Sequence, residues 1–402
     1  MVAHIDADGF FAACEVARRP HLQGKPVMVL GKLGGFVLAK TEAAKACGVK
    51  TVMRLHEAKK LCPHGIFLSG DLRYYTVVSR QLMSLLKTWS PVVQVTSIDE
   101  AFIDFTGLSE MHKTTDRGVA DAIRKSVSDQ LGITVSVGVA PNKTLAKMGS
   151  EANKPNGTTM IDPQSVDAFL KTQALGDIPG IGQRRQAFLE GTLVRTAYDF
   201  AQLPYTQVKK WFGITGVFLW RELNGESSFP LKPEREAPKQ IGRTSSFRTL
   251  TPDPTVIVGM SQFHLERALE SLHQWQLTTQ KITLYLRTKE LKRFYLEANL
   301  KEPTRNFQIM VKALTGLYQK IPIGFTWRSA GVFLTDLRPD TGKQLNLFDP
   351  IADQLKNDQL EAAKQALNQK YGHRTIMSGS MLLAEQEWRR DYERLIIANT
   401  AQ

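Results

Sequence analysis

The chain has 402 residues, 42% of them hydrophobic and 23% charged, which is the balance of an ordinary soluble protein with roughly two to four domains. Its 52 lysines and arginines outnumber 39 acids, and the resulting net charge of +13 favours a polyanionic partner, most simply nucleic acid. Composition alone leaves a basic RNA enzyme or a membrane-surface protein open. No apolar run approaches the roughly 18 residues that cross a bilayer, and the N-terminus lacks the basic start of a signal peptide.

The three cysteines, Cys14, Cys47 and Cys62, have no CxxC spacing. This pattern predicts a reducing compartment and argues against a disulfide scaffold or a cysteine-rich zinc site.

Strands and helices are expected to alternate over the first 160 residues. The predicted strands are 1–6, 26–30, 36–40, 92–95, 101–105 and 134–140, and the predicted helices are 10–18, 41–47, 72–89, 118–131 and 142–153. Such alternation predicts an α+β layer architecture.

The composition changes near residue 160. Residues 165–225 are expected to be helical, and the proline- and charge-rich residues 226–240 predict a linker. Strands at 282–287 and 327–337, with helices at 259–273 and 307–318, predict a further α/β domain of high positive charge. Two more helical stretches are expected at 351–371 and 385–397.

Three acids stand at the ends of predicted strands. Asp6 ends the first strand, and Asp99 and Glu100 lie side by side in a predicted hairpin. If these strands are neighbours, the carboxylates converge at one sheet edge, where their repulsion is costly unless a cation neutralises it. Oxygen ligands suit Mg²⁺, and two such ions can stabilise the attacking and leaving oxygens of a phosphoryl displacement. From spacing alone, three unrelated acids that cap turns remain an open alternative.

Four stretches of sequence, taken together and in order, resemble the Y-family (translesion) DNA polymerases of the DinB/UmuC group. They are Ile5–Glu15, Ser97–Ala101, Gly138–Lys147 and Asn153–Gly157. The resemblance extends over roughly residues 1–340 and implies a multidomain α+β fold with the right-hand architecture of polymerases. The domains that it implies are an α+β palm at 1–10 and 76–162, small fingers at 11–75, a helical thumb with a helix-hairpin-helix at 163–230, a linker at 231–240, an α/β little finger at 241–340, and a clamp-binding peptide with a tail at 341–402.

The resemblance also implies a role for each acid. Asp6 and Asp99 correspond to ligands that bridge two Mg²⁺ ions, for which Mn²⁺ is a substitute. Glu100 corresponds to the ligand on the ion that activates the primer 3′-hydroxyl, and the Ala7 carbonyl to a backbone ligand of the nucleotide-side ion. Asp8 and Asp104 are interpreted as structural residues.

The nucleotide site implied by the resemblance contains Phe10, Phe11, Lys45 and Lys154. Phe11 corresponds to the steric gate, since a rigid ring beside the metal site leaves no room for a ribose 2′-hydroxyl, whereas the adjacent Phe10 is expected to lie in the core. Lys154 and Lys45 are expected to meet the β- and γ-phosphates, with solvated helix faces as the alternative. Glu42 replaces a tyrosine of many DinB-like members and is expected to point away, and Lys40 could compensate.

Several segments are expected to hold DNA. Gly180 and Gly182, followed by Arg184 and Arg185, resemble a helix-hairpin-helix turn whose backbone amides bind a phosphate. Arg243, Arg248, Arg287 and Arg293 are the candidate backbone contacts of the little finger, of a kind that gives salt-sensitive binding without base specificity.

A short peptide after the last domain resembles the segment that docks on the bacterial sliding clamp. Its residues are Gln344, Leu345, Leu347 and Phe348. The long tail after it, with Glu42, favours a UmuC-like member, whereas Asn153–Gly157 favours a DinB-like one, so the branch stays open.

The resulting hypothesis is a DNA-directed DNA polymerase of the translesion type, of low fidelity and acting in DNA damage tolerance. Primer-template DNA, deoxynucleotides and the sliding clamp are the expected partners, accessory mutagenesis subunits stay open, and the expected location is the cytoplasm, with the nucleoid. The alternative is a catalytically inactive DNA- and clamp-binding adaptor of a mutagenesis complex, which is disfavoured because members of that kind lose the metal acids and Asp6, Asp99 and Glu100 are all present.

Overall fold

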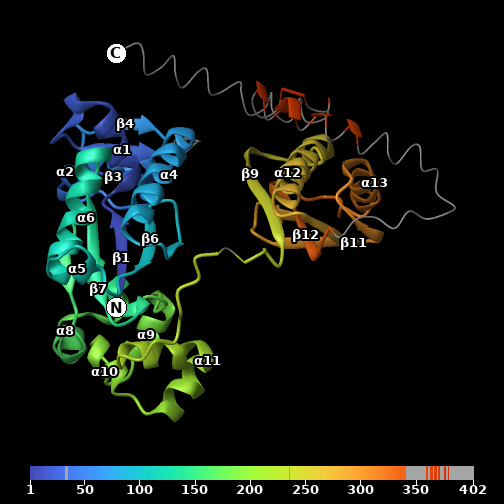
Figure 1. Ribbon diagram of the computed structural model, residues 1–402. Coiled ribbons are helices and arrows are strands. Elements are labelled where there is room, and N and C mark those ends of the chain that lie inside the picture. The colour runs from blue at the N-terminus through green and yellow to red at the C-terminus, as the bar shows by residue number, and fades with distance from the viewer. Residues whose placement is uncertain are drawn as a thin grey trace. The chain divides into compact units, whose positions relative to one another are not determined.

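The structure is a computed structural model that describes residues 1–31, 35–234 and 236–340, with residues 359, 360, 363, 364, 366–368, 370, 371, 375, 376 and 379 (Figure 1). The chain divides into two compact units, Met1–Arg235 and Glu236–Gln402. The boundary between them falls within residues 231–240, where a linker was expected. Among the described residues, no helix combines the length and hydropathy that crossing a membrane requires.

A five-stranded sheet with strand order β5-β6-β1-β7-β8 forms the framework of the first unit. Its strands are β1 (Val2–Ala7), β5 (Val93–Val95), β6 (Glu100–Asp104), β7 (Val135–Ala140) and β8 (Thr158–Met160). Strand β1 runs antiparallel to both β6 and β7, and β7 runs parallel to β8. The helices associated with this sheet are α4 (Leu72–Trp89), α5 (Leu108–Met111), α6 (Asp116–Leu131) and α7 (Lys143–Ala152).

The two faces of this sheet have different chemistry because side chains alternate along a strand. On one face, Ala3 and Ile5 of β1 join a core that includes residues of α4 and α6. On the other face, His4 of β1 contacts α7, where its Nδ1 lies 2.7 Å from Ser150 Oγ. Asp6 shares the parity of His4, so its carboxylate lies on the same face as α7.

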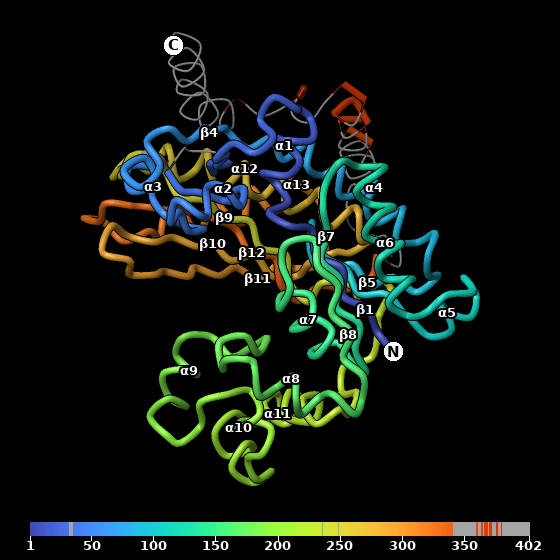
Figure 2. Tube along the Cα trace, turned by 90° about the vertical axis from the view of Figure 1, so that its left-hand side faces the viewer, coloured from blue at the N-terminus to red at the C-terminus, as the bar shows by residue number. Residues whose placement is uncertain are grey.

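A smaller three-stranded sheet, with order β3-β2-β4, lies at one end of the first unit (Figures 1 and 2). It consists of β2 (Val27–Leu30), β3 (Val37–Lys40) and β4 (Ile66–Ser69), accompanied by α1 (Phe10–Arg18), η1 (Pro20–Leu22), α2 (Glu42–Ala46) and α3 (Leu55–Leu61). The expected domain boundary at 75/76 falls inside α4, which is one continuous helix.

A group of helices lies at the opposite end of the first unit in both views (Figures 1 and 2). They are η2 (Pro163–Ser165), α8 (Val166–Thr172), η3 (Leu175–Asp177), α9 (Gln183–Glu190), α10 (Ala197–Ala201) and α11 (Tyr205–Leu223). Their apolar residues share a core with α7, which joins them to the acid-bearing face of the sheet.

The second unit contains a four-stranded antiparallel sheet with order β11-β10-β12-β9. Its elements are β9 (Ile241–Thr251), α12 (Pro254–Gln274), β10 (Leu277–Thr288), β11 (Arg293–Thr304), α13 (Phe307–Tyr318) and β12 (Trp327–Pro339). Ile282, Leu284 and Leu286 of β10 face the two helices in one core. The opposite face carries Tyr285 and the residues that share its parity.

Candidate active site

The ends of β1 and β6 bring the three acids together. The antiparallel register pairs Asp6 with Glu100, and the Ala7 amide donates to the Asp99 carbonyl at 3.0 Å. These contacts extend the strand pairing to the last residue of β1. The convergence expected from the strand ends is therefore present in the structure.

Asp6 is a mostly buried carboxylate with a lysine as its direct partner. Lys154 Nζ lies 2.7 Å from Asp6 Oδ1 and also 2.7 Å from Glu151 Oε1. Burial raises the pKa of Asp6 to about 6, although Lys154 acts in the opposite direction, and Glu151 and Asp99 add to the rise. The single lysine thus compensates the charge of Asp6 only in part.

Glu100 has a different environment from Asp6. Its carboxylate pairs with Lys147 of α7, His4 Nε2 lies 3.4 Å away, and Thr96 Oγ1 donates to it at 3.0 Å. His4 and Lys147 hold the pKa of Glu100 well below its usual range, so this carboxylate stays ionised at neutral pH. Ligand atoms of His4, Asp6 and Glu100 all lie within 4.8 Å of one another, a spacing that could hold a metal ion.

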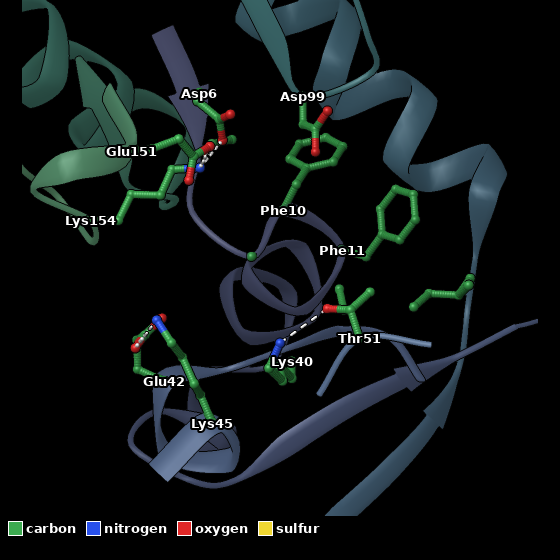
Figure 3. Close-up of a pocket in the computed structure, with 14 residues that line it drawn as sticks. Asp6, Phe10, Phe11, Lys40, Glu42, Lys45, Thr51, Asp99, Glu151 and Lys154 are labelled. Atoms are coloured by element: carbon green, nitrogen blue, oxygen red, sulfur yellow. Dashed lines mark hydrogen bonds and ion pairs between the residues drawn. The ribbon is translucent and has the colours of Figure 1, made fainter. Parts of the chain in front are cut away.

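A pocket of about 420 Å³ opens beside Asp6 and Asp99 (Figure 3). One side is formed by the acids with Glu151 and Lys154. The other side is formed by residues of the three-stranded sheet and the helix after it, namely Leu38, Ala39, Lys40, Glu42, Lys45 and Thr51. Phe10 and Phe11 lie between the two sides. Acidic and basic groups therefore surround a space that can hold a small molecule.

The start of α1 places the two phenylalanines. Gly9 precedes the helix with a left-handed φ of 55°, and a Cβ there would lie 2.8 Å from the Lys40 carbonyl oxygen, so only glycine fits. Phe10 is 2% exposed and belongs to the core, as expected. Phe11 is half-buried and stacks on Tyr75, with ring centroids 4.6 Å apart and planes at 16°.

The basic residues of the far wall form short-range pairs. Lys40 Nζ donates to Thr51 Oγ1 at 3.0 Å, and Lys45 Nζ lies 3.4 Å from Glu42 Oε2. The expectation that Glu42 points away from the pocket is wrong, because Glu42 lines it. The i,i+3 spacing on one helix turn lets Glu42 pair with Lys45.

Asp8 and Asp104 occupy structural positions. Asp8 accepts from Ser136 Oγ at 2.7 Å and from the Asn156 amide at 2.8 Å, which joins the end of β1 to β7 and to the loop of Lys154. Asp104, the last residue of β6, accepts from the Thr106 amide at 3.0 Å. Neither acid lines the pocket of Figure 3.

The glycine-containing turn before α9 is exposed at Gly182 and Arg184. Gly182 is the N-cap of α9, and Arg185 donates to the Gly180 carbonyl at 3.0 Å. The turn thus leaves the first amides of α9 toward solvent, the arrangement that an anion contact requires.

The arginines of the second unit lie on different faces of its sheet. Arg287 and Arg293 are cross-strand partners on the face away from the helices. Arg243 lies on the helix-covered face, where its Nη2 donates to Ser271 Oγ of α12 at 2.5 Å. The register of β9 thus places Arg243 on the opposite face of the sheet from Arg287 and Arg293. Arg248 lies on β9, and Gln344, Leu345, Leu347 and Phe348 lie outside the described residues.

Several residues at the site have no sequence motif that predicts a role for them. They are His4, Tyr75, Lys147 and Glu151. The sequence offered one usable signal, since Glu151 and Lys154 have the i,i+3 spacing of a helical ion pair. The other contacts depend on tertiary packing.

Two family models match the chain. The impB/mucB/samB family matches residues 5–151, and the impB/mucB/samB family C-terminal domain matches residues 238–347. DNA polymerase IV of Staphylococcus aureus (strain JH9) is 30% identical over 357 residues, covering 87% of this chain and 99% of that protein. The chain belongs to the Y-family DNA polymerases.

Further relatives place it in the DinB-like branch of that family. DNA polymerase IV 1 of Bacillus subtilis (strain 168) is 29% identical over 392 residues, which is 96% of this chain and 94% of that protein. A match of that extent includes most residues after Phe348, so the long tail is no argument for a UmuC-like member. The branch left open by the sequence is thus DinB-like.

Solved structures agree with this assignment. A Y-family DNA polymerase chimera aligns with a TM-score of 0.70 and 27% identity, covering 84% of this chain and 99% of its own. An insertion ternary complex of Dbh DNA polymerase aligns with a TM-score of 0.60 and 26% identity over 84% and 99% of the two chains. The protein is accordingly a DNA-directed DNA polymerase of the translesion type, with the expected multidomain α+β fold.

Proposed function

We propose that the corner formed by Asp6, Asp99 and Glu100 is where the chain extends a primer 3′-end, by phosphoryl transfer assisted by two divalent ions. The observation that carries the proposal is the pocket of Figure 3, which joins Asp6 and Asp99 to Phe11 and to basic residues. A deoxynucleotide triphosphate needs this combination, because its phosphates require cations and its sugar requires an apolar contact.

The donor set at this corner fits a divalent cation. Burial leaves Asp6 with a raised pKa of about 6 even beside Lys154, which is the state of a carboxylate that lacks sufficient positive charge. Asp6, Asp99, Glu100 and the Ala7 carbonyl would supply the oxygen ligands that Mg²⁺ or Mn²⁺ prefers. When bound, such ions neutralise phosphate charge and orient the reacting oxygens.

The lysines bind the triphosphate in this proposal. Lys154 Nζ, which lies between Asp6 and Glu151, becomes available for phosphate oxygens once another cation neutralises Asp6. Lys45 and Lys40 approach the same pocket from the opposite wall, and their partners Glu42 and Thr51 are exposed groups that water can replace. Each lysine acts as a point charge.

Phe11 selects the sugar in this proposal. Its ring is held against Tyr75, and the Tyr75 hydroxyl donates to the buried Glu15 at 2.8 Å. A ring supported from behind in this way cannot retreat to admit a 2′-hydroxyl. The support, and not the ring alone, is thus part of the discrimination.

The domain names follow from this assignment. We assign the five-stranded sheet to the palm, β2–β4 with α2 and α3 to the fingers, α8–α11 to the thumb, and β9–β12 with α12 and α13 to the little finger. The turn before α9 and the face of Arg287 and Arg293 would hold the DNA backbone. Such contacts carry no base information, which suits damaged templates and a polymerase of low fidelity.

We further propose that Gln344–Phe348 docks on the sliding clamp. The motif combines a hydrogen-bonding glutamine with apolar anchors, a composition suited to an apolar cleft on a partner. Deleting it is expected to remove clamp-stimulated synthesis and to leave basal synthesis intact. Equal loss of both activities would show a structural role.

Primer extension by an Asp99→Ala variant tests the catalytic assignment. We expect a loss of at least about a thousandfold in extension rate, while affinity for primer-template DNA stays within about twofold. Asp104→Ala is the matched control, since it removes an acid from the same strand region without touching the pocket. Extension that persists in Asp99→Ala would reject the assignment, and a wild type without extension would favour the adaptor alternative.

A further inference from the structure

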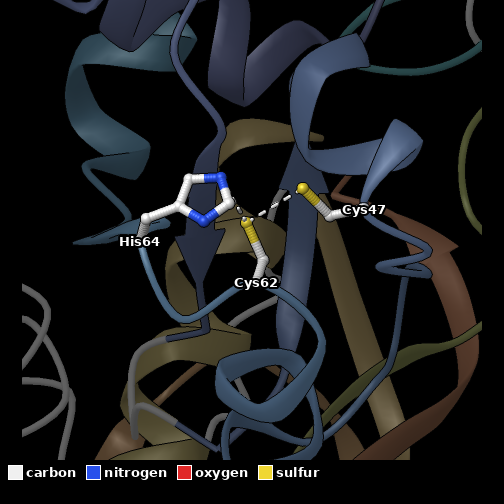
Figure 4. Close-up of side chains that lie close together, drawn as sticks. All are labelled: Cys47, Cys62 and His64. Atoms are coloured by element: carbon white, nitrogen blue, oxygen red, sulfur yellow. Dashed lines mark hydrogen bonds between the residues drawn. The ribbon is translucent and has the colours of Figure 1, made fainter.

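A second group of metal-ligating side chains lies outside the polymerase pocket. Cys47 Sγ and Cys62 Sγ are 3.2 Å apart, and His64 Nε2 lies 3.9 Å from Cys62 Sγ (Figure 4). All three ligand atoms lie within 4.8 Å of one another. Cysteines 15 positions apart, without the usual close spacing, are thus brought together by the fold.

Two helix ends and one turn produce this convergence. Cys47 is the C-cap of α2 and Cys62 is the C-cap of α3. After Cys62 the chain reverses, with the Gly65 amide donating to the Cys62 carbonyl at 3.0 Å. Proline at the second position and glycine at the fourth are favoured in such a turn, and a Cβ on Gly65 would lie 3.1 Å from Cys62 Sγ. The turn returns His64 toward the thiol that precedes it.

We propose that Cys47, Cys62 and His64 bind one Zn²⁺ ion, with the fourth position open to water. Two thiolates and one imidazole are a ligand set that zinc uses in proteins. With Zn–S near 2.3 Å and Zn–N near 2.0 Å, tetrahedral geometry needs about 3.8 Å between the sulfurs and about 3.6 Å from sulfur to nitrogen. The observed 3.2 Å between the sulfurs is about 0.6 Å shorter, and the observed 3.9 Å from sulfur to nitrogen about 0.3 Å longer, than these separations.

The charges and protons of binding balance. Zn²⁺ displaces one proton from each thiol and none from neutral imidazole, so two protons are released and the site becomes neutral. Burial, followed by the neighbouring Cys47, raises the pKa of Cys62 to about 11, so the metal must compete with protons and its affinity rises with pH. His64 is exposed and leaves an approach from solvent.

The position of His64 close to both sulfurs favours a metal site over a disulfide. A disulfide would use the two sulfurs and give the imidazole no function, whereas a metal uses all three groups. The site also stands apart from Asp6 and Asp99, so this inference does not depend on the catalytic assignment. Its link to the pocket is α2, since Cys47 follows the helix that carries Glu42 and Lys45.

Cobalt substitution tests the proposal on the full-length protein. Co²⁺ added to the reduced chain without oxygen is expected to give a thiolate-to-cobalt charge-transfer band that saturates at one ion per chain and disappears when Zn²⁺ is added. Carboxylate sites cannot produce this band, so Co²⁺ at Asp6 and Asp99 does not interfere. Cys47→Ser and Cys62→Ser are expected to lose at least about tenfold in affinity and most of the band.

His64→Asn keeps the test decisive if a cysteine variant misfolds, because His64 is exposed on a turn. It is expected to weaken Co²⁺ and Zn²⁺ binding at least about tenfold, because the loss of a residue that only hydrogen-bonds to a metal ligand already weakens binding by that factor. Cys14→Ala is the matched control, since Cys14 is buried in a different core, and it should leave band and affinity unchanged. No charge-transfer band in the reduced wild type, or full affinity in His64→Asn, would overturn the proposal.

Discussion

The acidic corner of the first unit is formed by Asp6, Asp99 and Glu100. It uses charge in the opposite way to the open face of the second unit, which is the face of its sheet that points away from α12 and α13. At the corner, Asp6 and Glu100 are largely buried and each has a lysine partner. On the open face, Arg287 and Arg293 lie directly opposite each other on neighbouring strands, where like charges repel. A buried, paired group is sensitive to one substitution, whereas a basic surface of the half-buried Arg287 and the exposed Arg293 responds gradually. This difference fits the proposal that the chemistry takes place at the corner and that the face binds DNA without sequence specificity.

Removing the support behind the pocket should have the largest effect. Glu15 is fully buried and accepts from Tyr75, from Arg18 at 2.9 Å and from Arg19 at 2.8 Å. Glu15→Ala removes this acceptor from the buried Tyr75 hydroxyl and from two partly exposed arginines, of which Arg18 keeps its pair with Asp71, and should lower the free energy of unfolding by about 2–3 kcal/mol. Urea unfolding measures this loss. Tyr75→Phe is the control, removing one hydrogen bond and costing about 1 kcal/mol. Similar losses in both variants would contradict the view that the corner depends on a buried charge network.

Sugar selection tests the same corner at the level of substrate. Phe11→Ala should raise the efficiency of ribonucleotide relative to deoxynucleotide insertion about a hundredfold, because the ring that occupies the space of a 2′-hydroxyl is gone. Single-nucleotide insertion kinetics with both sugars measure the ratio. Tyr75→Ala should raise the ratio by a smaller factor, since the ring of Phe11 would lose its stacking partner. An unchanged ratio in Phe11→Ala would place the gate elsewhere.

The second unit contains a buried group whose titration should affect stability in acid. Burial, followed by Arg267 and Arg243, lowers the pKa of His264 to about 3, and its Nε2 lies 2.8 Å from Ser245 Oγ. Protonation therefore favours the unfolded chain, so this contribution is complete above about pH 6.5 and is lost as the pH falls toward 3. At about pH 5 the loss is on the order of 2 kcal/mol.

A histidine variant separates this effect from general acid sensitivity. His264→Gln should reduce the difference between the free energies of unfolding at about pH 7.5 and about pH 5. The exposed His56→Gln should leave that difference unchanged. If both variants behave like the wild type, His264 does not titrate as its burial requires.

The open face should give the smallest effect. Replacing Arg287 and Arg293 together with alanine should reduce the slope of log affinity against log salt by about 2 for duplex DNA, because two phosphate contacts are lost. Arg243→Ala is the matched control, since that side chain bonds Ser271 on the helix-covered face. A slope that falls equally in the control would mean that the two faces of the sheet do not differ in this way.

Helices with regularly spaced apolar residues and recognisable capping residues could be predicted from the sequence. The helices at 10–18 and 72–89 are found with those bounds, because Gly9 and the Asp71 side chain, which accepts from Tyr74, mark where they begin. Strands β9 and β11 were not predicted, because neither contains a continuous apolar run, although the alternating exposure of β11 is the pattern of a half-buried strand. The helix expected at 259–273 begins earlier, at Pro254, where Asp253 caps it.

The same limits apply to the candidate site. Asp6, Asp99 and Glu100 could be chosen because each stands at a strand end, where pairing alone brings them together. The partner of Glu100, Lys147, could not be chosen, because only the packing of α7 on the sheet brings it there. The face on which Arg243 lies could not be chosen for a related reason, since the face of a residue depends on strand register.

Location of the metal ions in a substrate complex tests the central claim most directly. Crystals of the full chain with primer-template DNA, a non-hydrolysable deoxynucleotide analogue and Mn²⁺ would show each ion by its anomalous scattering. We expect peaks bound by Asp6 and Asp99, with Lys154 Nζ moved from Asp6 to the phosphates. Manganese at other residues, or a Lys154 that keeps its 2.7 Å pair with Asp6 while nucleotide is bound, would contradict that claim.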